Sequence, residues 1–198
     1  MAYGKVMMLQ GASSAGKSTL AKALQTSLEE YWWVLEADDI THMQPVWQPP
    51  KWWEPTREER PHPSWDPKVR LARWLDGYWG CLATIAKTGS NVIAVGGWLE
   101  TSWLVQLAEA LEGIDAYCVG VRCPLEELER RERERGDRPS GYARSQFEIV
   151  HAHAPFDVEF DITKVSTEEA VSLIEAMLGS PPAEPFFARV RREFAGSK

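Results

Sequence analysis

The chain has 198 residues and a formal net charge of −7, with 44% of its residues hydrophobic and 26% charged. These values are typical of one soluble globular domain with a sizeable core, and the acidic balance argues against a nucleic-acid partner, which would favour a basic surface. No apolar run reaches membrane-spanning length, no leader-like segment begins the chain, and three cysteines without CxxC spacing argue against a disulfide framework, so we expect a cytoplasmic protein.

The first elements predicted along the chain surround a phosphate-binding loop. An apolar run at 6–9 leads into GASSAGKS at 11–18, which has the form GxxxxGK[ST], and a helical pattern from 17 to about 30 follows. A buried strand, a glycine-rich turn and a helix N-terminus in this order bind the phosphates of a nucleoside triphosphate. Lys17 would reach the β- and γ-phosphates, and the Ser18 hydroxyl would be a ligand of Mg²⁺. We therefore predict that ATP binds at Gly11, Ser13, Ser14, Ala15, Gly16, Lys17, Ser18 and Thr19.

A second predicted strand, at 32–35, ends in a run of acids. Glu36, Asp38 and Asp39 follow it directly, and ligands bind at the carboxyl ends of the strands in a doubly wound sheet. We predict that Asp38 or Asp39 is the base for an acceptor hydroxyl or contacts Mg²⁺. The other interpretation, compatible with the first because two acids are present, is that one of them caps a helix beginning near residue 40.

The composition changes abruptly in a segment at 44–66, which holds four tryptophans among six prolines. Proline removes backbone donors and fixes φ, so neither a regular helix nor a central strand is expected here. Two interpretations stay open. Either the segment covers the substrate and grips a planar or apolar acceptor with its rings, or it is a surface excursion that its own tryptophans hold in place.

Downstream, short apolar runs alternate with amphipathic helices. Helices are predicted at about 66–87 and 101–111 and at 167–179, and strands at 91–95, 116–121 and 158–162. This alternation predicts an α/β fold, with a five-stranded parallel sheet and helices on both of its faces. We expect one domain at 1–179 and a C-terminal extension at 180–198. The helical spacing at 186–194 favours packing on its own domain over docking on a second subunit.

A strongly charged helix is predicted at 124–135. Most of its face is expected to be solvated and to carry i,i+4 ion pairs, including Glu127 with Arg131 and Glu129 with Arg133. The helix ends in RGDR at 135–138, and two arginines beside a phosphate loop favour a lid at about 135–141 that closes over the nucleotide. The alternative is a basic helix end that stabilises its own dipole.

These motifs resemble those of the chloramphenicol 3-O-phosphotransferase family. Beside GASSAGKS, the likeness lies in AD at 37–38, VGVRC at 119–123, RGDR at 135–138, VH at 150–151 and FDVE at 156–159, so it extends from near residue 5 to near 178. VGVRC and RGDR in this order are far more specific than the loop alone. The resemblance implies a P-loop, nucleoside-kinase-like fold and transfer of the ATP γ-phosphoryl group to a substrate hydroxyl. It also implies that Asp38 is the base, Lys17 the phosphate clamp, Ser18 the Mg²⁺ ligand, and Arg135 and Arg138 the lid arginines.

Two departures from this family bear on magnesium and on the acceptor. The family tends to carry acids at the end of the third strand, where this chain has Val95-Gly96-Gly97 and Glu100 is the nearest acid. Support for Mg²⁺ would then have to come from Asp38, Asp39 or Glu100. The insertion at 44–66 occupies the region that would recognise the acceptor, so chloramphenicol itself is not predicted as the substrate.

We therefore predict an ATP- and Mg²⁺-dependent O-phosphotransferase that acts on a small-molecule hydroxyl acceptor. Antibiotics, and with them antibiotic resistance, are among the acceptors and roles considered. A kinase of a nucleotide or sugar precursor, including a toxin-like kinase, shares the loop, base and lid and stays open. A non-catalytic ATP-binding module is the third interpretation, favoured by the missing acid and the aromatic insertion. Whether the protein is a homo-oligomer is left open by the sequence.

Overall fold

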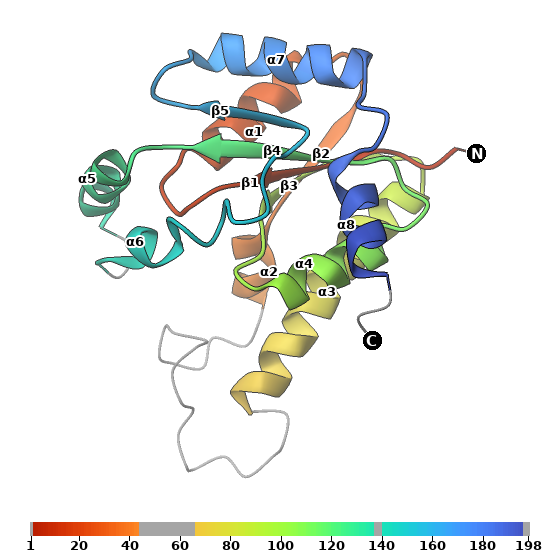
Figure 1. The fold of residues 1–198 in the computed structure, drawn as a ribbon, viewed down its shortest axis with the longest axis horizontal. Coiled ribbons are helices and arrows are strands. Elements are labelled where there is room, and N and C mark those ends of the chain that lie inside the picture. The colour runs from red at the N-terminus through yellow and green to blue at the C-terminus, as the bar shows by residue number, and fades with distance from the viewer. Residues whose placement is uncertain (1, 44–65, 137–139, 196–198) are drawn as a thin grey trace.

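The molecule is built on a parallel sheet of five strands between two layers of helices, in the part of the chain that the computed structural model describes, residues 2–43, 66–136 and 140–195 (Figure 1). Its spatial order is β2-β3-β1-β4-β5, and all neighbouring pairs are parallel. The strands are β1 (Val6–Gln10), β2 (Trp32–Glu36), β3 (Asn91–Gly96), β4 (Ala116–Arg122) and β5 (Val158–Asp161). The central strand β1 is buried along its whole length, as a strand covered on both faces should be. The predicted five-stranded parallel sheet flanked by helices is confirmed.

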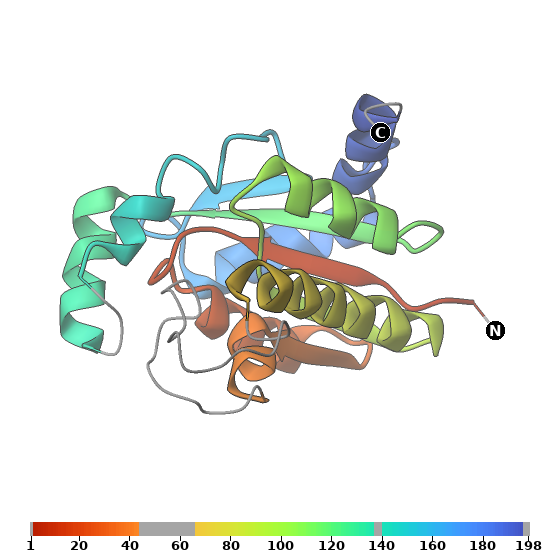
Figure 2. The same ribbon diagram turned by 90° about the horizontal axis from the view of Figure 1, so that it is seen from below.

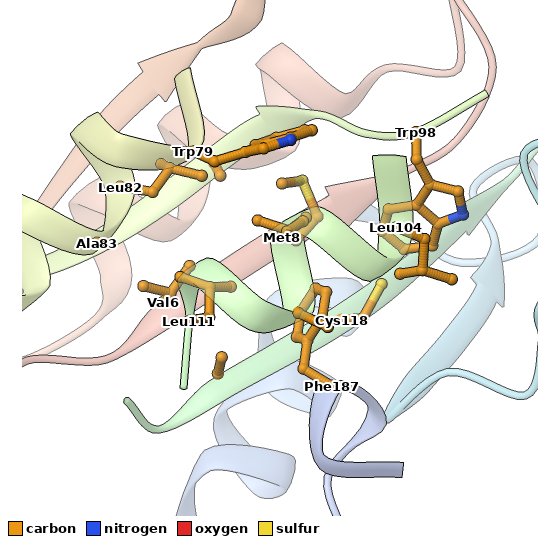
Figure 3. Close-up of a cluster of buried hydrophobic side chains, with 14 of the residues drawn as sticks. Val6, Met8, Trp79, Leu82, Ala83, Trp98, Leu104, Leu111, Cys118 and Phe187 are labelled. Atoms are coloured by element: carbon orange, nitrogen blue, oxygen red, sulfur yellow. The ribbon is translucent and has the colours of Figure 1, made fainter. Parts of the chain in front are cut away.

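One face of the sheet is covered by α3 (Pro67–Lys87), α4 (Thr101–Ala110) and α8 (Phe186–Phe194), as Figures 1 and 2 show. Asp66 begins α3 by accepting hydrogen bonds from the N–H groups of residues 68 and 69, with proline at the first helical position. The core under these helices appears in Figure 3. It includes Met8 of β1, Trp79 of α3, Leu104 of α4, Cys118 of β4 and Phe187 of α8.

The C-terminal helix α8 belongs to this core. Phe186 and Phe187 are at most 1% exposed, and Phe186 stacks on Trp98 with ring centroids 5.5 Å apart. The Asp157 carboxylate accepts hydrogen bonds from the N–H of Phe186 and from the N–H of Cys118 in β4. It therefore ties the start of the helix to this strand. The segment therefore packs on its own domain, as its spacing predicts. The boundary at residue 179 stays a prediction.

The opposite face is covered by α1 (Lys17–Ser27) and α7 (Thr167–Gly179), which lie above the sheet in Figure 1. Leu20 and Leu24 of α1 and Ile174 of α7 are fully buried between these helices and the sheet. Helix α7 begins with a capping box formed by Ser166 and Glu169. Helix α1 ends at Ser27 rather than near residue 30, because Leu28 already has extended backbone dihedrals.

Three further helices lie at the edge where the strands end. Helix α2 (Ala37–Met43) follows β2, and α5 (Leu125–Arg135) and α6 (Tyr142–Gln146) follow β4 (Figure 1). Helix α2 begins directly after the strand rather than near residue 40, and α6 was not predicted. The prediction for 44–66 lies outside the described residues, apart from Asp66. None of the described helices is long and apolar enough to cross a membrane.

Candidate active site

The phosphate loop at 11–16 joins the buried β1 to the N-terminus of α1, the context that its motif requires. A Cβ on Gly11 would lie 2.4 Å from the carbonyl oxygen of Val121, so only glycine fits beside β4. Gly16 has φ 93° and Ser14 has φ 65°, both in the left-handed region. These dihedrals curl the backbone tightly, which is the form in which successive N–H groups converge on an anion.

The Lys17 side chain folds back over this loop. Its ammonium donates hydrogen bonds to the carbonyl oxygens of Gly11 and Ala12, both at 2.7 Å. The positive charge is therefore held against the loop by the protein's own backbone. A lysine held in this way is positioned for phosphoryl oxygens before a nucleotide arrives.

The end of β2 contacts the start of α1 through two side chains. The Ser18 hydroxyl donates a hydrogen bond of 2.9 Å to Oε2 of Glu36, the last residue of β2. Ser18 was predicted as a site residue, whereas Glu36 was not. The sequence signal for Glu36 is its place as the first acid at the end of a predicted strand, at the edge of the sheet where ligands bind.

A hydroxyl and a carboxylate beside a phosphate loop are the oxygen ligands that Mg²⁺ prefers. Among the described residues, no group of three or more His, Cys, Asp or Glu side chains is arranged to hold a metal by itself. This donor set fits Mg²⁺, which is usually bound by one or two protein groups together with substrate phosphates and water. Ser18 and Glu36 are the residues that would hold it.

Asp38 and Asp39 have different surroundings in the first turn of α2. The Asp39 carboxylate accepts a hydrogen bond of 3.2 Å from the backbone N–H of Glu36. Glu36 precedes the helix and Asp39 is its third residue, so this bond is one half of a capping box. Asp38 is partly buried, two residues after the carboxylate that contacts Ser18. Neither acid is the N-cap of a helix beginning near residue 40, as one interpretation had it, because α2 begins at Ala37 and Asp39 binds the N–H of the preceding Glu36 from inside the first turn.

Helix α5 brings an arginine to the phosphate loop that the sequence analysis did not select. Nη1 of Arg131 lies 3.6 Å from the position of a Cβ on Gly16, and its Nε donates to Glu127 at 2.7 Å. Hydrogen bonds from Arg130 and Arg131 lower the pKa of Glu127 to about 2. Arg135 follows one turn after Arg131, and this i,i+4 spacing was the signal that could have identified it.

Two predictions about this helix have other outcomes. Arg138 and the preceding residue of the RGDR motif at 135–138 lie outside the described residues, so the lid stays a prediction. Of the two predicted i,i+4 pairs, Glu127 with Arg131 is confirmed, whereas Glu129 pairs with Arg144 of α6 at 2.6 Å.

The chain after the lid region is anchored at both of its ends. Glu132 is 4% exposed, and its carboxylate accepts hydrogen bonds of 2.7 Å from the N–H groups of Gly141 and Ala143. At the end of α6, Oε1 of Gln146 accepts a hydrogen bond of 2.8 Å from the N–H of Ser13 in the phosphate loop. Helix α6 thus connects α5 to the loop. The prediction of a solvated helix face missed Glu132, which acts as a buried anchor.

His151 lies beside the same site in a poorly solvated position. Burial, and then the positive charges of Arg122 and Lys17, lower its pKa to about 4. Its Nδ1 is 3.6 Å from Oε1 of Glu159, and the same oxygen is 2.8 Å from Nε of Arg122. The ring is therefore neutral near pH 7. It therefore adds no positive charge to that of Arg122 and Lys17.

The phosphate loop on this parallel sheet defines a P-loop kinase, and solved structures have the same fold. The APS kinase of Mycobacterium tuberculosis, in complex with AMPPNP and APS, has a TM-score of 0.65 at 17% identity and covers 91% of this chain and 100% of its own. A gluconokinase from Sinorhizobium meliloti has a TM-score of 0.58 at 18% identity and covers 100% and 99%.

The chain belongs to the chloramphenicol phosphotransferase-like protein family, whose pattern matches residues 4–179. Two proteins of Mycobacterium tuberculosis, from strains CDC 1551 and H37Rv, bear the name "Putative O-phosphotransferase" and are each 31% identical over 208 residues. These matches cover 98% of this chain and 91% of the relatives. The protein is accordingly a phosphotransferase with an alcohol group as acceptor, as the motifs predict.

Proposed function

We propose that this protein transfers the γ-phosphoryl group of ATP, in the presence of Mg²⁺, to a hydroxyl group of a small molecule. The observation that carries the proposal is the preformed phosphate loop, with the Lys17 ammonium held across it and the acidic end of β2 bonded to its Ser18. Membership of the family and the kinase fold support the same reaction.

In this proposal the residues act mainly by positioning and electrostatics. The loop N–H groups from 11 to 19 and Lys17 bind the triphosphate, while Arg131, Arg135 and Arg138 stabilise the charge that develops on the transferred group. Asp38 orients the acceptor hydroxyl and accepts its proton. Bound Mg²⁺ supplies further neutralisation of the phosphate charge.

The acceptor is the part of the function that needs a direct search. We place hydroxylated antibiotics first, because the family's description includes chloramphenicol. Nucleosides and sugars come next, since a precursor kinase would use the same loop and base.

The test is phosphoryl transfer from ATP and Mg²⁺ to a panel of these compounds, with mass spectrometry to detect one added phosphoryl group. We expect at least one acceptor to be phosphorylated by the wild type. The Lys17→Ala variant should be slower by about 10³-fold or more, because it lacks the ammonium that stabilises negative charge on the transferred phosphoryl group. A wild type that binds ATP yet phosphorylates no member of a broad panel would favour the non-catalytic module.

A further inference from the structure

The carboxylate that contacts the phosphate loop comes from β2, at the edge of the sheet. Glu36 Oε2 accepts the hydrogen bond from Ser18 at 2.9 Å, although β3 lies between β2 and the central β1. In the register of the sheet, Glu36 is opposite Val95, directly before the two glycines that end β3. The acid therefore sits one strand away from the place where the related enzymes tend to carry theirs.

The end of β3 has no room for an acidic side chain. A Cβ on Gly97 would lie 1.5 Å from Oε1 of Gln10, and Gly97 has φ 139°. A Cβ on Gly96 would lie 2.9 Å from the Cβ of Ala37 and 3.3 Å from the Tyr78 hydroxyl. Neighbouring side chains thus fill the space on both glycines, so these two positions cannot supply a carboxylate without a rearrangement of the core.

The same neighbours hold the end of β2 in place. Tyr78 is completely buried, and its hydroxyl lies 3.2 Å from the carbonyl oxygen of Leu35 and 3.1 Å from that of Val95, so it bridges β2 and β3. Burial first, and then the nearby Glu36 carboxylate, raise the pKa of Tyr78 and keep its phenol neutral. Asp39 binds the Glu36 N–H from the other side. The backbone at the end of β2 is therefore held by Tyr78 through Leu35 and by Asp39 through the Glu36 N–H.

We propose that Glu36 is the carboxylate of the Mg²⁺ site and, together with Ser18, replaces the acids that are missing at the end of β3. This inference rests on the proposed function, since it assumes that ATP binds as its Mg²⁺ complex. Of the three acids named as substitutes from the sequence, Asp39 caps α2 and Glu100 accepts from Ser102 at 3.3 Å, at the start of α4. Asp38 is kept for the acceptor.

The length of the side chain follows from the same geometry. The contact with Ser18 on α1 is made by the far end of the Glu36 side chain, and glutamate is one methylene longer than aspartate. We therefore expect Glu36→Asp to keep the negative charge but to hold Mg²⁺ poorly. Glu36→Gln keeps the length and can still accept from Ser18 through its amide oxygen, so it should fold normally and lose the charge alone.

The experiment is calorimetric titration of ATP into the full chain, once with Mg²⁺ and once with EDTA. Wild type should bind ATP at least 10-fold more tightly with Mg²⁺ than without. Glu36→Gln should lose most of this gain, yet bind ATP in EDTA as tightly as wild type or more tightly, because a carboxylate that repels the phosphates is gone. Glu175→Gln is the matched control, since Glu175 is exposed on α7, and it should behave as wild type.

The opposite changes in the two conditions separate a Mg²⁺ role from a structural one, because a damaged loop would weaken binding in both. A Glu36→Gln variant that keeps the full gain from Mg²⁺ would overturn the inference and leave the proposed function standing. So would an equal loss in both conditions. A wild type that binds no ATP in either condition would overturn the proposed function itself and this inference with it.

Discussion

Asp38 and Asp39 are neighbours in the sequence, yet they have different surroundings at the start of α2, where Asp39 accepts a hydrogen bond from the Glu36 N–H. We expect Asp38→Asn to bind ATP as wild type does and to transfer the phosphoryl group about 10²–10⁴-fold more slowly, since general-base catalysis contributes about that much. Asp39→Asn should retain transfer within a few-fold, because an asparagine side chain still accepts from the Glu36 N–H. The measurements are ATP affinity and the rate of transfer to the acceptor found in the panel.

If Asp38→Asn keeps its rate while Asp39→Asn loses it, the base is Asp39 and the capping bond does not exclude a catalytic role. Equal, small losses in both variants would place the base elsewhere in the site. Far-UV circular dichroism of each variant controls for a change in folding.

Residues of the phosphate loop could be predicted because their chemistry is encoded locally, in eight consecutive positions. Glu36 and Arg131 were not selected, since the sequence shows their positions on β2 and α5 but not that these elements pack beside the loop. The Ser18–Glu36 contact joins residues 18 positions apart, on α1 and at the end of β2. The glycines at 96–97 were visible as a departure, but the reason that no acid fits there lies in Gln10, Ala37 and Tyr78.

Helices α5 and α6 are joined by the buried carboxylate of Glu132, which makes their arrangement sensitive to one charge. We expect Glu132→Gln to lower the free energy of unfolding by about 2 kcal/mol, because the two charge-assisted hydrogen bonds are lost. The amide oxygen of glutamine can replace one of them with a neutral hydrogen bond, and its NH₂ group would face the other backbone N–H. The measurement is urea unfolding, with hydrogen exchange at Gly141 and Ala143 as the local readout.

Glu126→Gln is the control for this change, because Glu126 is exposed on the same helix. Its stability and its exchange rates should match those of the wild type. Unchanged exchange at Gly141 and Ala143 in the Glu132→Gln variant would contradict the anchoring role.

Long elements with a clear apolar stripe were predicted to within a few residues, including α3, α7 and α8. The two shortest helices, α2 and α6, were not. Helix α6 has five residues, too few for a helical period to show, and it is held by contacts with Glu132 and the phosphate loop. Helix α2 begins earlier than expected, because Asp39 caps it from inside the first turn.

Across the whole molecule, composition and alternation were enough for the sheet and its helical layers, whereas the order of the strands required the structure. Parallel strands are connected through helices, so the sequence pattern contains the strands but not which of them are neighbours. The place where α8 packs on the domain likewise required the structure. Its spacing indicated an apolar face, and the stacking of Phe186 on Trp98 shows which part of the domain that face covers.

Stability of the molecule in acid should depend on the two histidines near the site. Burial lowers the pKa of His153 as well as that of His151, whose folded value of about 4 lies below its usual 6.5. A neutral ring favoured by folding contributes stability above pH 6.5, and this contribution is lost as the pH falls toward 4. For His151 we expect a loss on the order of 1–2 kcal/mol, less than the full shift implies because the ring keeps some contact with water.

Urea unfolding of wild type, His151→Gln, His153→Gln and the double variant between pH 7 and 5 tests this. The double variant should be less stable than wild type at pH 7 or equal to it, and its stability should change least as the pH falls. Glu127, with a pKa of about 2, stays ionised between pH 7 and 5, so its titration does not contribute to the measured slopes. A slope that is the same in wild type and in His151→Gln would show that water reaches the His151 ring freely.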